Sequence, residues 1–262
     1  MRIVVDQCET YVYTGSRALV AAQPSVLFVH GAAHDHSVWA LQSRYFAHHG
    51  FNALAVDLPG HGRSAGHPLS AIDAIAGWLP RVLDAVGVAS AAVVGHSMGS
   101  LAALACAGRH GDRVSKVALL GPAVPMAVSD ALLAAARADD HLAFELINGW
   151  SHSAGKQLGG NQVPGMWMTG ASMRLMDRSG PGVLYNDLTA CADYAGGLDA
   201  AAAVRCPVLA IMGARDVMAP PGGAQAMLAA LAQATVVTLP DTGHAMMAEQ
   251  PDAVLDALRR FL

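Results

Sequence analysis

The sequence predicts an α/β fold, with an eight-stranded, mostly parallel sheet flanked by helices and an inserted helical cap. Short, continuous apolar runs recur along the chain, which is typical of strands buried on both faces. Helical segments with one apolar stripe lie between these runs. The alternation stops after Gly121 and resumes at Pro207, which favours an insertion within one sheet over a second domain. We expect a core of residues 1–121 and 204–262 and a cap of residues 122–203.

The expected strands fall into two groups. The opening segments Arg2–Val5 and Thr10–Thr14 are more polar and suit a hairpin at the edge of the sheet. The continuous apolar runs are Ser25–Val29, Ala53–Val56, Ala91–Val94, Val117–Leu120, Val208–Ile211 and Val236–Leu239. Within the cap, we expect helical stretches around residues 130–148, 171–178 and 184–194.

Composition narrows the classes of function. Charged residues make up only 14% of the 262, the net charge is −4, and no run of like charge occurs. This pattern disfavours nucleic acid and anionic membranes as partners and favours small-molecule chemistry. Residues 1–6 lack the apolar stretch of a signal peptide, so we expect a cytoplasmic protein. The four cysteines are scattered and are interpreted as reduced thiols. The oligomeric state is left open.

The strongest local motif is Gly95-His96-Ser97-Met98-Gly99. It follows a buried strand and opens a helix, which is the setting of a nucleophilic serine on a sharp turn. Glycines on either side leave room for strand and helix to approach each other. The helix N-terminus directs backbone N–H groups and a positive dipole toward a developing oxyanion. We therefore predict that Ser97 is a nucleophile rather than part of a structural turn.

A serine hydroxyl needs a base, and twelve histidines compete for that role. His244 follows the last strand, at the edge of a parallel sheet where Ser97 also emerges. Asp216 follows the strand before it and completes the chain order serine, acid, histidine. We predict Asp216 as the acid that orients His244, with Asp241 as the fallback, and we expect a hydrogen bond between Ser97 and His244.

Oxyanion stabilisation needs backbone donors from two places. His30-Gly31-Ala32 follows the strand Ser25–Val29 and suits the loop that supplies one donor. The residue after the nucleophile supplies the other. We assign the backbone N–H groups of Ala32 and Met98.

Taken together, these motifs resemble those of the α/β-hydrolase superfamily. The resemblance rests on His30-Gly31 with Trp39 downstream, Asp57–Ser64 (DLPGHGRS), the serine motif, Gly213-x-x-Asp216 and Gly243-His244. It is strongest with single-domain esterases that carry a helical cap, and weakest between residues 121 and 204. The presence of Ser97 separates the chain from relatives with a nucleophilic aspartate, such as epoxide hydrolases. Ser100 departs from the pattern, since many relatives have a glycine there.

One motif suggests a metal site. His34-Asp35-His36 contains three potential ligands, but the metallo-hydrolase pattern would require histidines at positions occupied by Gly31 and Ala33. We expect no metal and no cofactor, and interpret His34, Asp35 and His36 as lining the rim of the active-site mouth.

The cap brings a group of apolar side chains that includes Met166, Trp167 and Met168. Two interpretations stand side by side, packing of the cap onto the core and a role in the substrate pocket. We place His34, Met166, Trp167 and Met168 in the pocket wall. An apolar lid favours an acyl or aromatic substrate over a sugar or polyanion.

The resemblance implies a serine hydrolase acting on small to medium carboxylic esters through an acyl-enzyme. Carbon–carbon bond hydrolases, perhydrolases and lactonases share the motifs, and the first of these would need groups for a second carboxylate, such as Arg174 and Arg178. A protein of another class, a non-catalytic binder on the same scaffold, is the remaining alternative.

Overall fold

The computed structural model describes residues 1–160, 165 and 167–262. Within these residues, eight strands form one sheet in the order β1-β2-β4-β3-β5-β6-β7-β8, which confirms the expected architecture. β1 pairs antiparallel with β2 and β2 with β4, whereas all other neighbours are parallel. The strands are β1 (Arg2–Val5), β2 (Cys8–Tyr13), β3 (Ser25–Val29), β4 (Asn52–Val56), β5 (Ala91–His96), β6 (Val114–Leu120), β7 (Val208–Gly213) and β8 (Ala234–Leu239).

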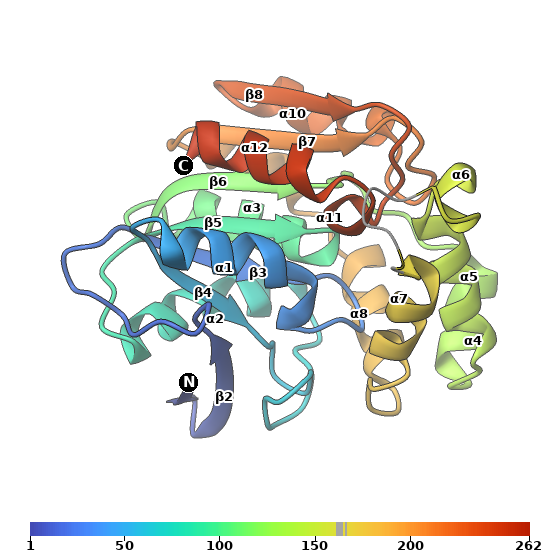
Figure 1. Ribbon diagram of the computed structural model, residues 1–262, viewed down its shortest axis with the longest axis horizontal. Helices are drawn as coiled ribbons and strands as arrows, with labels where there is room; N and C mark the ends of the chain where they lie inside the picture. Colours follow the sequence, from blue (N-terminus) through green and yellow to red (C-terminus); the bar gives the residue numbers. More distant parts are fainter. Residues whose placement is uncertain (161–164, 166) are drawn as a thin grey trace.

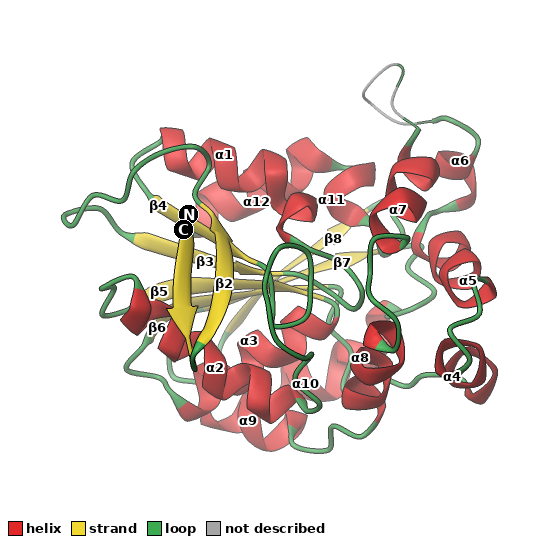
Figure 2. Cartoon of the chain, turned by 90° about the horizontal axis from the view of Figure 1, so that it is seen from below, coloured by secondary structure: helices red, strands yellow, loops and turns green. Residues whose placement is uncertain are grey.

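Helices cover both faces of this sheet, as Figure 2 shows. One layer contains α1 (Ala40–His48), α11 (Met246–Glu249) and α12 (Pro251–Phe261), and the other contains α2 (Ile72–Ala85), α3 (Met98–Arg109), α9 (Gly197–Ala203) and α10 (Gln225–Ala230). The short helices η1 (His36–Trp39) and η2 (Pro221–Ala224) precede α1 and α10. Every residue of β3, β4, β5 and β7 is buried, which explains their continuous apolar runs.

The remaining helices lie beyond the carboxyl ends of the parallel strands (Figure 1). They are α4 (Asp130–Arg137), α5 (Leu142–Ser151), α6 (Ala154–Gln157), α7 (Met168–Met176) and α8 (Val183–Ala192). We call this group the cap. Its apolar side chains form a small cluster of their own, which also contains Ala33 from the loop after β3. The cap is therefore packed onto that loop rather than tethered only at its ends.

The last helix of the inserted segment, α9, packs on the core rather than in the cap. α9 packs against α3, where a Cβ added to Gly108 would lie 2.7 Å from the carbonyl oxygen of Ala200. α9 thus lies in a helical layer of the core, although it precedes residue 204. The division of the chain at residues 121 and 204 stays a prediction.

Three further features are the hydropathy of the helices, the state of the cysteines and the position of the chain ends. No helix among the described residues has the length and apolar character needed to cross a membrane. The four cysteines are free thiols, and burial raises the pKa of Cys106 to about 12. The C-terminus lies at the end of the sheet opposite the cap, whereas the N-terminus lies beside β2 at the edge of the sheet (Figure 1).

Candidate active site

Ser97 lies at the turn between β5 and α3, with φ 53° and ψ −120°. Few side-chain-bearing residues adopt a positive φ, and holding one there costs about 1–3 kcal/mol. The surrounding chain maintains this geometry, since Ser97 N–H donates to the carbonyl of Leu120 at 2.9 Å. The strained turn presents the serine at the carboxyl end of the sheet.

The glycines of this turn are required by close backbone contacts. A Cβ on Gly95 would lie 2.0 Å from the carbonyl oxygen of Gly99. A Cβ on Gly99 would lie 2.4 Å from the carbonyl oxygen of Val29, at the end of β3. Strand, turn and helix therefore fit together only with hydrogen at both positions.

His244 and Asp216 form a buried pair next to this turn. The Nδ1–H group of His244 donates to Oδ2 of Asp216 at 2.7 Å. The other carboxylate oxygen of Asp216 accepts the N–H groups of Met218 and Ala219 at 2.9 and 2.8 Å. The carboxylate therefore caps the following loop and also orients the histidine.

Asp241, the fallback acid, occupies a different environment. Its side chain is 82% exposed and lies 3.6 Å from Arg215. The structure thus places Asp216, and not Asp241, beside His244.

The hydrogen bond expected between Ser97 and His244 is not formed in this structure. Nε2 of His244 is buried and has no hydrogen-bond partner among the described residues. Because Nδ1 carries the proton donated to Asp216, Nε2 of the neutral ring is an acceptor. Ser97 and His244 line the same cavity. Such contacts are often long in structures without ligand and tighten when substrate binds.

Gly121, just after β6, makes room for the His244–Asp216 pair. Its φ is +57°, and an added Cβ would lie 3.0 Å from Cε1 of His244 and 3.5 Å from Oδ2 of Asp216. A glycine after a strand is a common sequence feature, so its packing against the candidate base His244 could not be identified from spacing alone.

The loop of residues 30–34, which contains the predicted oxyanion donor Ala32 and is called the oxyanion loop below, approaches Ser97, the predicted nucleophile. A Cβ on Gly31 would lie 3.1 Å from Cβ of Ser97. No described residue accepts a hydrogen bond from the N–H of Ala32, and Met98 begins α3, where N–H groups lack intrahelical acceptors. Both groups assigned to the oxyanion hole are therefore available as donors.

Three further histidines surround the pair and the oxyanion loop, and none of them favours a positive charge. Burial lowers the pKa of His96 and His30 well below the ordinary range, and that of His34 as well. His96 Nε2–H donates to the carbonyl of His244 at 2.9 Å, and His34 Nδ1–H donates to the carbonyl of Ala32 at 2.6 Å. As neutral rings they position the backbone of His244 and Ala32 without adding charge to the site.

The cavity above Ser97 has a volume of about 720 Å³ and is bounded by both core and cap. It contains His34 and Met168, two of the four side chains predicted for the pocket wall. Its described lining is mainly apolar and includes no lysine or arginine. Arg174, with an 87% exposed side chain, and Arg178 both lie outside it.

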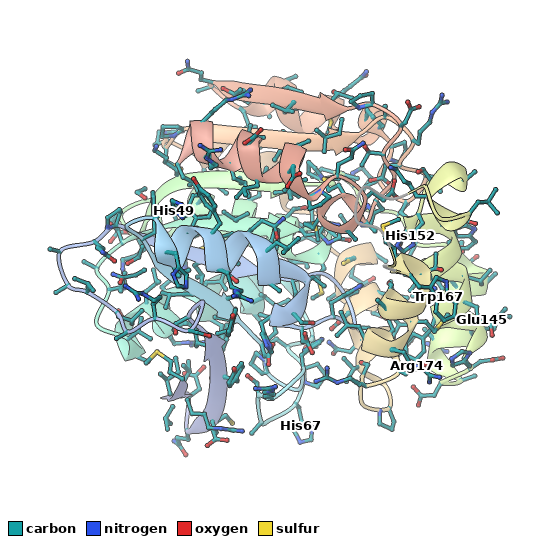
Figure 3. All side chains as sticks on the ribbon, in the orientation of Figure 1. His49, His67, Glu145, His152, Trp167 and Arg174 are labelled. Atoms are coloured by element: carbon teal, nitrogen blue, oxygen red, sulfur yellow. The ribbon has the colours of Figure 1, made fainter. Side chains whose placement is uncertain are left out.

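Trp167 does not lie in the pocket wall. Its side chain is 75% exposed and folds over Gly170, where an added Cβ would meet the indole ring. Figure 3 shows it on the cap, below His152. The ring therefore packs on its own helix rather than on the cavity. Met166, the remaining predicted wall residue, lies outside the described residues.

The three residues of the His34-Asp35-His36 segment lie in different environments. His34 lines the cavity, whereas Asp35 and His36 are buried beneath the rim, so their predicted place at the mouth is wrong. His36 donates to Oδ1 of Asp57 through both its N–H and Nδ1–H, each at 2.7 Å. Asp35, His36 and Asp57 come within ligand distance of one another, but protein donors occupy their oxygens. We interpret the cluster as structural.

Two buried acids contact the loops that carry the candidate site residues, and neither was predicted. Asp187, in α8 of the cap, accepts the N–H of Ala33 at 2.9 Å. Glu249, in α11, accepts the N–H of Gly243 at 3.1 Å and that of Ser153 at 2.9 Å. Neither acid lies in a recognisable motif. Only His61, which pairs with Asp187, could have been noticed from the sequence, because His61 belongs to the DLPGHGRS motif.

The chain belongs to the α/β-hydrolase fold family, whose model matches residues 24–251. Among curated relatives, it is 28% identical to the pimeloyl-[acyl-carrier protein] methyl ester esterase of Chromobacterium violaceum. That alignment covers 91% of this chain and 94% of the esterase. A shorter alignment, 39% identical, links it to the acetyltransferase component of the acetoin cleaving system of Cupriavidus necator. It covers 37% of this chain and spans about a quarter (26%) of that relative's length.

Solved structures give the same fold. The enol-lactonase from Burkholderia xenovorans LB400 superimposes with a TM-score of 0.88 at 24% identity. The match covers 100% of this chain and 99% of the lactonase. At this identity the likeness establishes the fold alone.

Proposed function

We propose that the protein is a serine hydrolase that cleaves small to medium carboxylic esters through an acyl-enzyme. The observation that carries the proposal is the His244–Asp216 pair, hydrogen-bonded at 2.7 Å, in which His244 keeps a buried, unpartnered Nε2 and lines the same cavity as Ser97. An oriented histidine with an unoccupied acceptor nitrogen next to a serine is the arrangement required to activate a hydroxyl.

The steps follow from the named groups. Ser97 Oγ attacks the substrate carbonyl as His244 Nε2 takes its proton, and Asp216 stabilises the resulting imidazolium. The N–H groups of Ala32 and Met98 hydrogen-bond to the tetrahedral oxyanion. His244 then returns the proton to the leaving alcohol, and a water deprotonated by the same histidine releases the acid.

The cavity supports a neutral, largely apolar acyl group. Its described lining holds no cationic side chain that would pair with a second carboxylate, which counts against the carbon–carbon hydrolase alternative. Lactones would undergo the same attack and remain in the substrate panel. A cytoplasmic location and the lack of nucleic-acid or membrane partners stay predictions from composition.

A panel of p-nitrophenyl esters and lactones tests the proposal. We expect turnover of at least one ester, labelling of the wild-type protein by a fluorophosphonate, and loss of both in Ser97→Ala. Asp241→Asn, which removes the exposed acid, is the matched control and should retain activity. Activity that persists in Ser97→Ala, or an absence of both turnover and labelling in the wild type, would contradict it. Activity should also survive a chelator, and restoration by zinc after chelation would reveal a metal role.

A further inference from the structure

We propose that Asp187 of the cap is a positioning residue for the oxyanion hole, and that it acts as one half of a buried ion pair with His61. The proposal rests on the proposed function and names a way in which the cap controls that site. It makes the placement of the Ala32 donor dependent on a contact that the cap supplies.

The contacts place Asp187 directly on the oxyanion loop. Oδ2 of Asp187 accepts the N–H of Ala33 at 2.9 Å. The carbonyl of the same peptide group, that of Ala32, accepts Nδ1–H of His34 at 2.6 Å. The Ala32–Ala33 peptide is therefore held at both ends, immediately after the N–H assigned to the oxyanion hole.

Ala33 needs such a contact because of its backbone. Its φ is +53°, an uncommon conformation for a residue with a side chain. It is also part of the apolar cluster of the cap, together with Leu184 and Leu188, which flank Asp187 on α8. Displacement of α8 would thus remove both the polar and the apolar support of the loop.

The same oxygen of Asp187 faces a histidine of the core. Nε2 of His61 lies 2.8 Å from Oδ2 of Asp187, and Nδ1 lies 2.9 Å from the carbonyl oxygen of Pro59. A carboxylate and a carbonyl accept hydrogen bonds and do not donate them. Both ring nitrogens must therefore carry protons, which makes His61 an imidazolium.

The charged surroundings of His61 support this assignment. Burial alone would lower the pKa of His61, but the charge and hydrogen bond of Asp187, the Pro59 carbonyl and the charge of Asp57 outweigh it, and the pKa is raised. The neighbouring rings, His30 with its centroid 5.0 Å away and His34, are neutral and add no competing charge.

Removal of the charge on Asp187 tests the proposal with a small activated ester, p-nitrophenyl acetate, whose acyl group is only two carbons long. Asp187→Asn can no longer stabilise the imidazolium, so His61 becomes neutral and the loop loses its support. We expect kcat to fall by about tenfold with KM nearly unchanged, since misplacement of an oxyanion donor affects the transition state. Asp193→Asn, an exposed acid at the end of the same helix, is the matched control and should behave as the wild type.

The pH profile separates positioning from a merely structural role. In the wild type, kcat should fall at alkaline pH as His61 loses its proton. In Asp187→Asn and in His61→Gln this alkaline decline should be absent. The kcat of both variants should already be below that of the wild type at neutral pH. A loss of active fraction, counted by fluorophosphonate titration, with an unchanged pH profile of the remaining enzyme would overturn the proposal.

A measurement that does not depend on activity is ¹⁵N NMR of the histidine side chains, which reports the protonation of each ring. We expect the imidazole of His61 to remain doubly protonated at neutral pH in the wild type, and its signals to be missing in His61→Gln and to report a neutral ring in Asp187→Asn. A neutral His61 ring at neutral pH in the wild type would overturn the ion pair even if esters are hydrolysed. If the ion pair is present but no ester is hydrolysed, the proposed function fails and the positioning role fails with it.

Discussion

On each side of the cavity that contains Ser97, a buried carboxylate links the cap to a loop of the core. The two carboxylates differ in the hydrogen-bond partners that they have. On the oxyanion side, Asp187 joins the cap to the loop of Ala33 and pairs with His61. On the histidine side, Glu249 joins Gly243, the neighbour of His244, to Ser153 of the cap. The partners of Glu249 are backbone N–H groups and a hydroxyl, none of which titrates near neutral pH.

This difference separates two ways of fixing a catalytic loop. A carboxylate satisfied by neutral donors should hold the loop of His244 over a wide range of pH. A carboxylate whose partner is an imidazolium holds its loop only while that partner stays charged. One wall of the cavity is thus constant, and the other responds to pH.

The largest effect is expected on the histidine side, from Glu249→Gln. The fully buried carboxylate accepts three N–H or O–H groups of Gly243 and Ser153, and an amide nitrogen would face these donors without accepting from them. Each buried donor left unpaired costs about 1–3 kcal/mol, so we expect the free energy of unfolding to fall by about 3 kcal/mol. Urea denaturation measures it, with the exposed Asp252→Asn as control. We expect the free energy of unfolding to fall by a similar amount at pH 6 and at pH 9. A strongly pH-dependent decrease would contradict the difference that we infer between the two sides of the cavity.

The next effect concerns the glycine beside the catalytic pair. In Gly121→Ala, the new methyl group would press on His244 from 3.0 Å and the backbone would be strained by about 1–3 kcal/mol. We expect kcat for p-nitrophenyl acetate to fall by about tenfold, since a displaced base loses its alignment with the serine. Gly149→Ala in α5, where nothing lies within 4 Å of the added carbon, should leave kcat unchanged. Equal kcat values in the two variants would contradict the packing role of Gly121.

The third effect is the pH dependence of stability on the oxyanion side. The pKa of His61 is raised on folding, so its contribution to stability is fully present below the pKa of the unfolded chain and is lost as the pH rises through the folded value. The difference in free energy of unfolding between wild type and His61→Gln should therefore be largest near pH 6 and decline toward pH 9. Chemical denaturation at several pH values measures this. A difference that grows with pH would mean that His61 is neutral in the folded protein.

The smallest effect distinguishes the inner from the outer surface of the cap. Met168 lines the cavity and is buried, whereas the adjacent Trp167 is largely exposed. Met168→Ala should change the preference for octanoyl over acetyl esters by about fivefold, or ~1 kcal/mol, as apolar contact area is lost. Trp167→Ala should leave this preference unchanged. A larger change from Trp167→Ala would place the acyl pocket on the other face of α7.

Local pattern predicted the sheet well, and it is also the basis on which the candidate catalytic residues were chosen. The runs that became β3, β4, β5 and β7 are buried on both faces, and this burial produces a visible stretch of apolar letters. Ser97, Asp216 and His244 each follow a strand, and the topology of a parallel sheet brings such positions to one edge.

Tertiary contacts between distant segments could not be predicted in this way. Ala33 and Asp187 are 154 residues apart, and no spacing rule relates a cap helix to a loop of the core. Trp167 and Met168 are neighbours in sequence, yet only Met168 faces the cavity. Which side of α7 faces inward depends on packing, which a cluster of apolar letters does not specify.

The position of the C-terminus has a practical consequence. The carbonyl oxygens of Phe261 and Leu262 accept hydrogen bonds from Lys116 near the amino end of β6, whereas the cavity is lined by residues of the cap and of the loops at the carboxyl ends of the strands. A fluorescent protein or a solid support attached through the C-terminus would therefore sit on the opposite pole from the mouth. Substrate diffusion to Ser97 should be unaffected by immobilisation through this terminus.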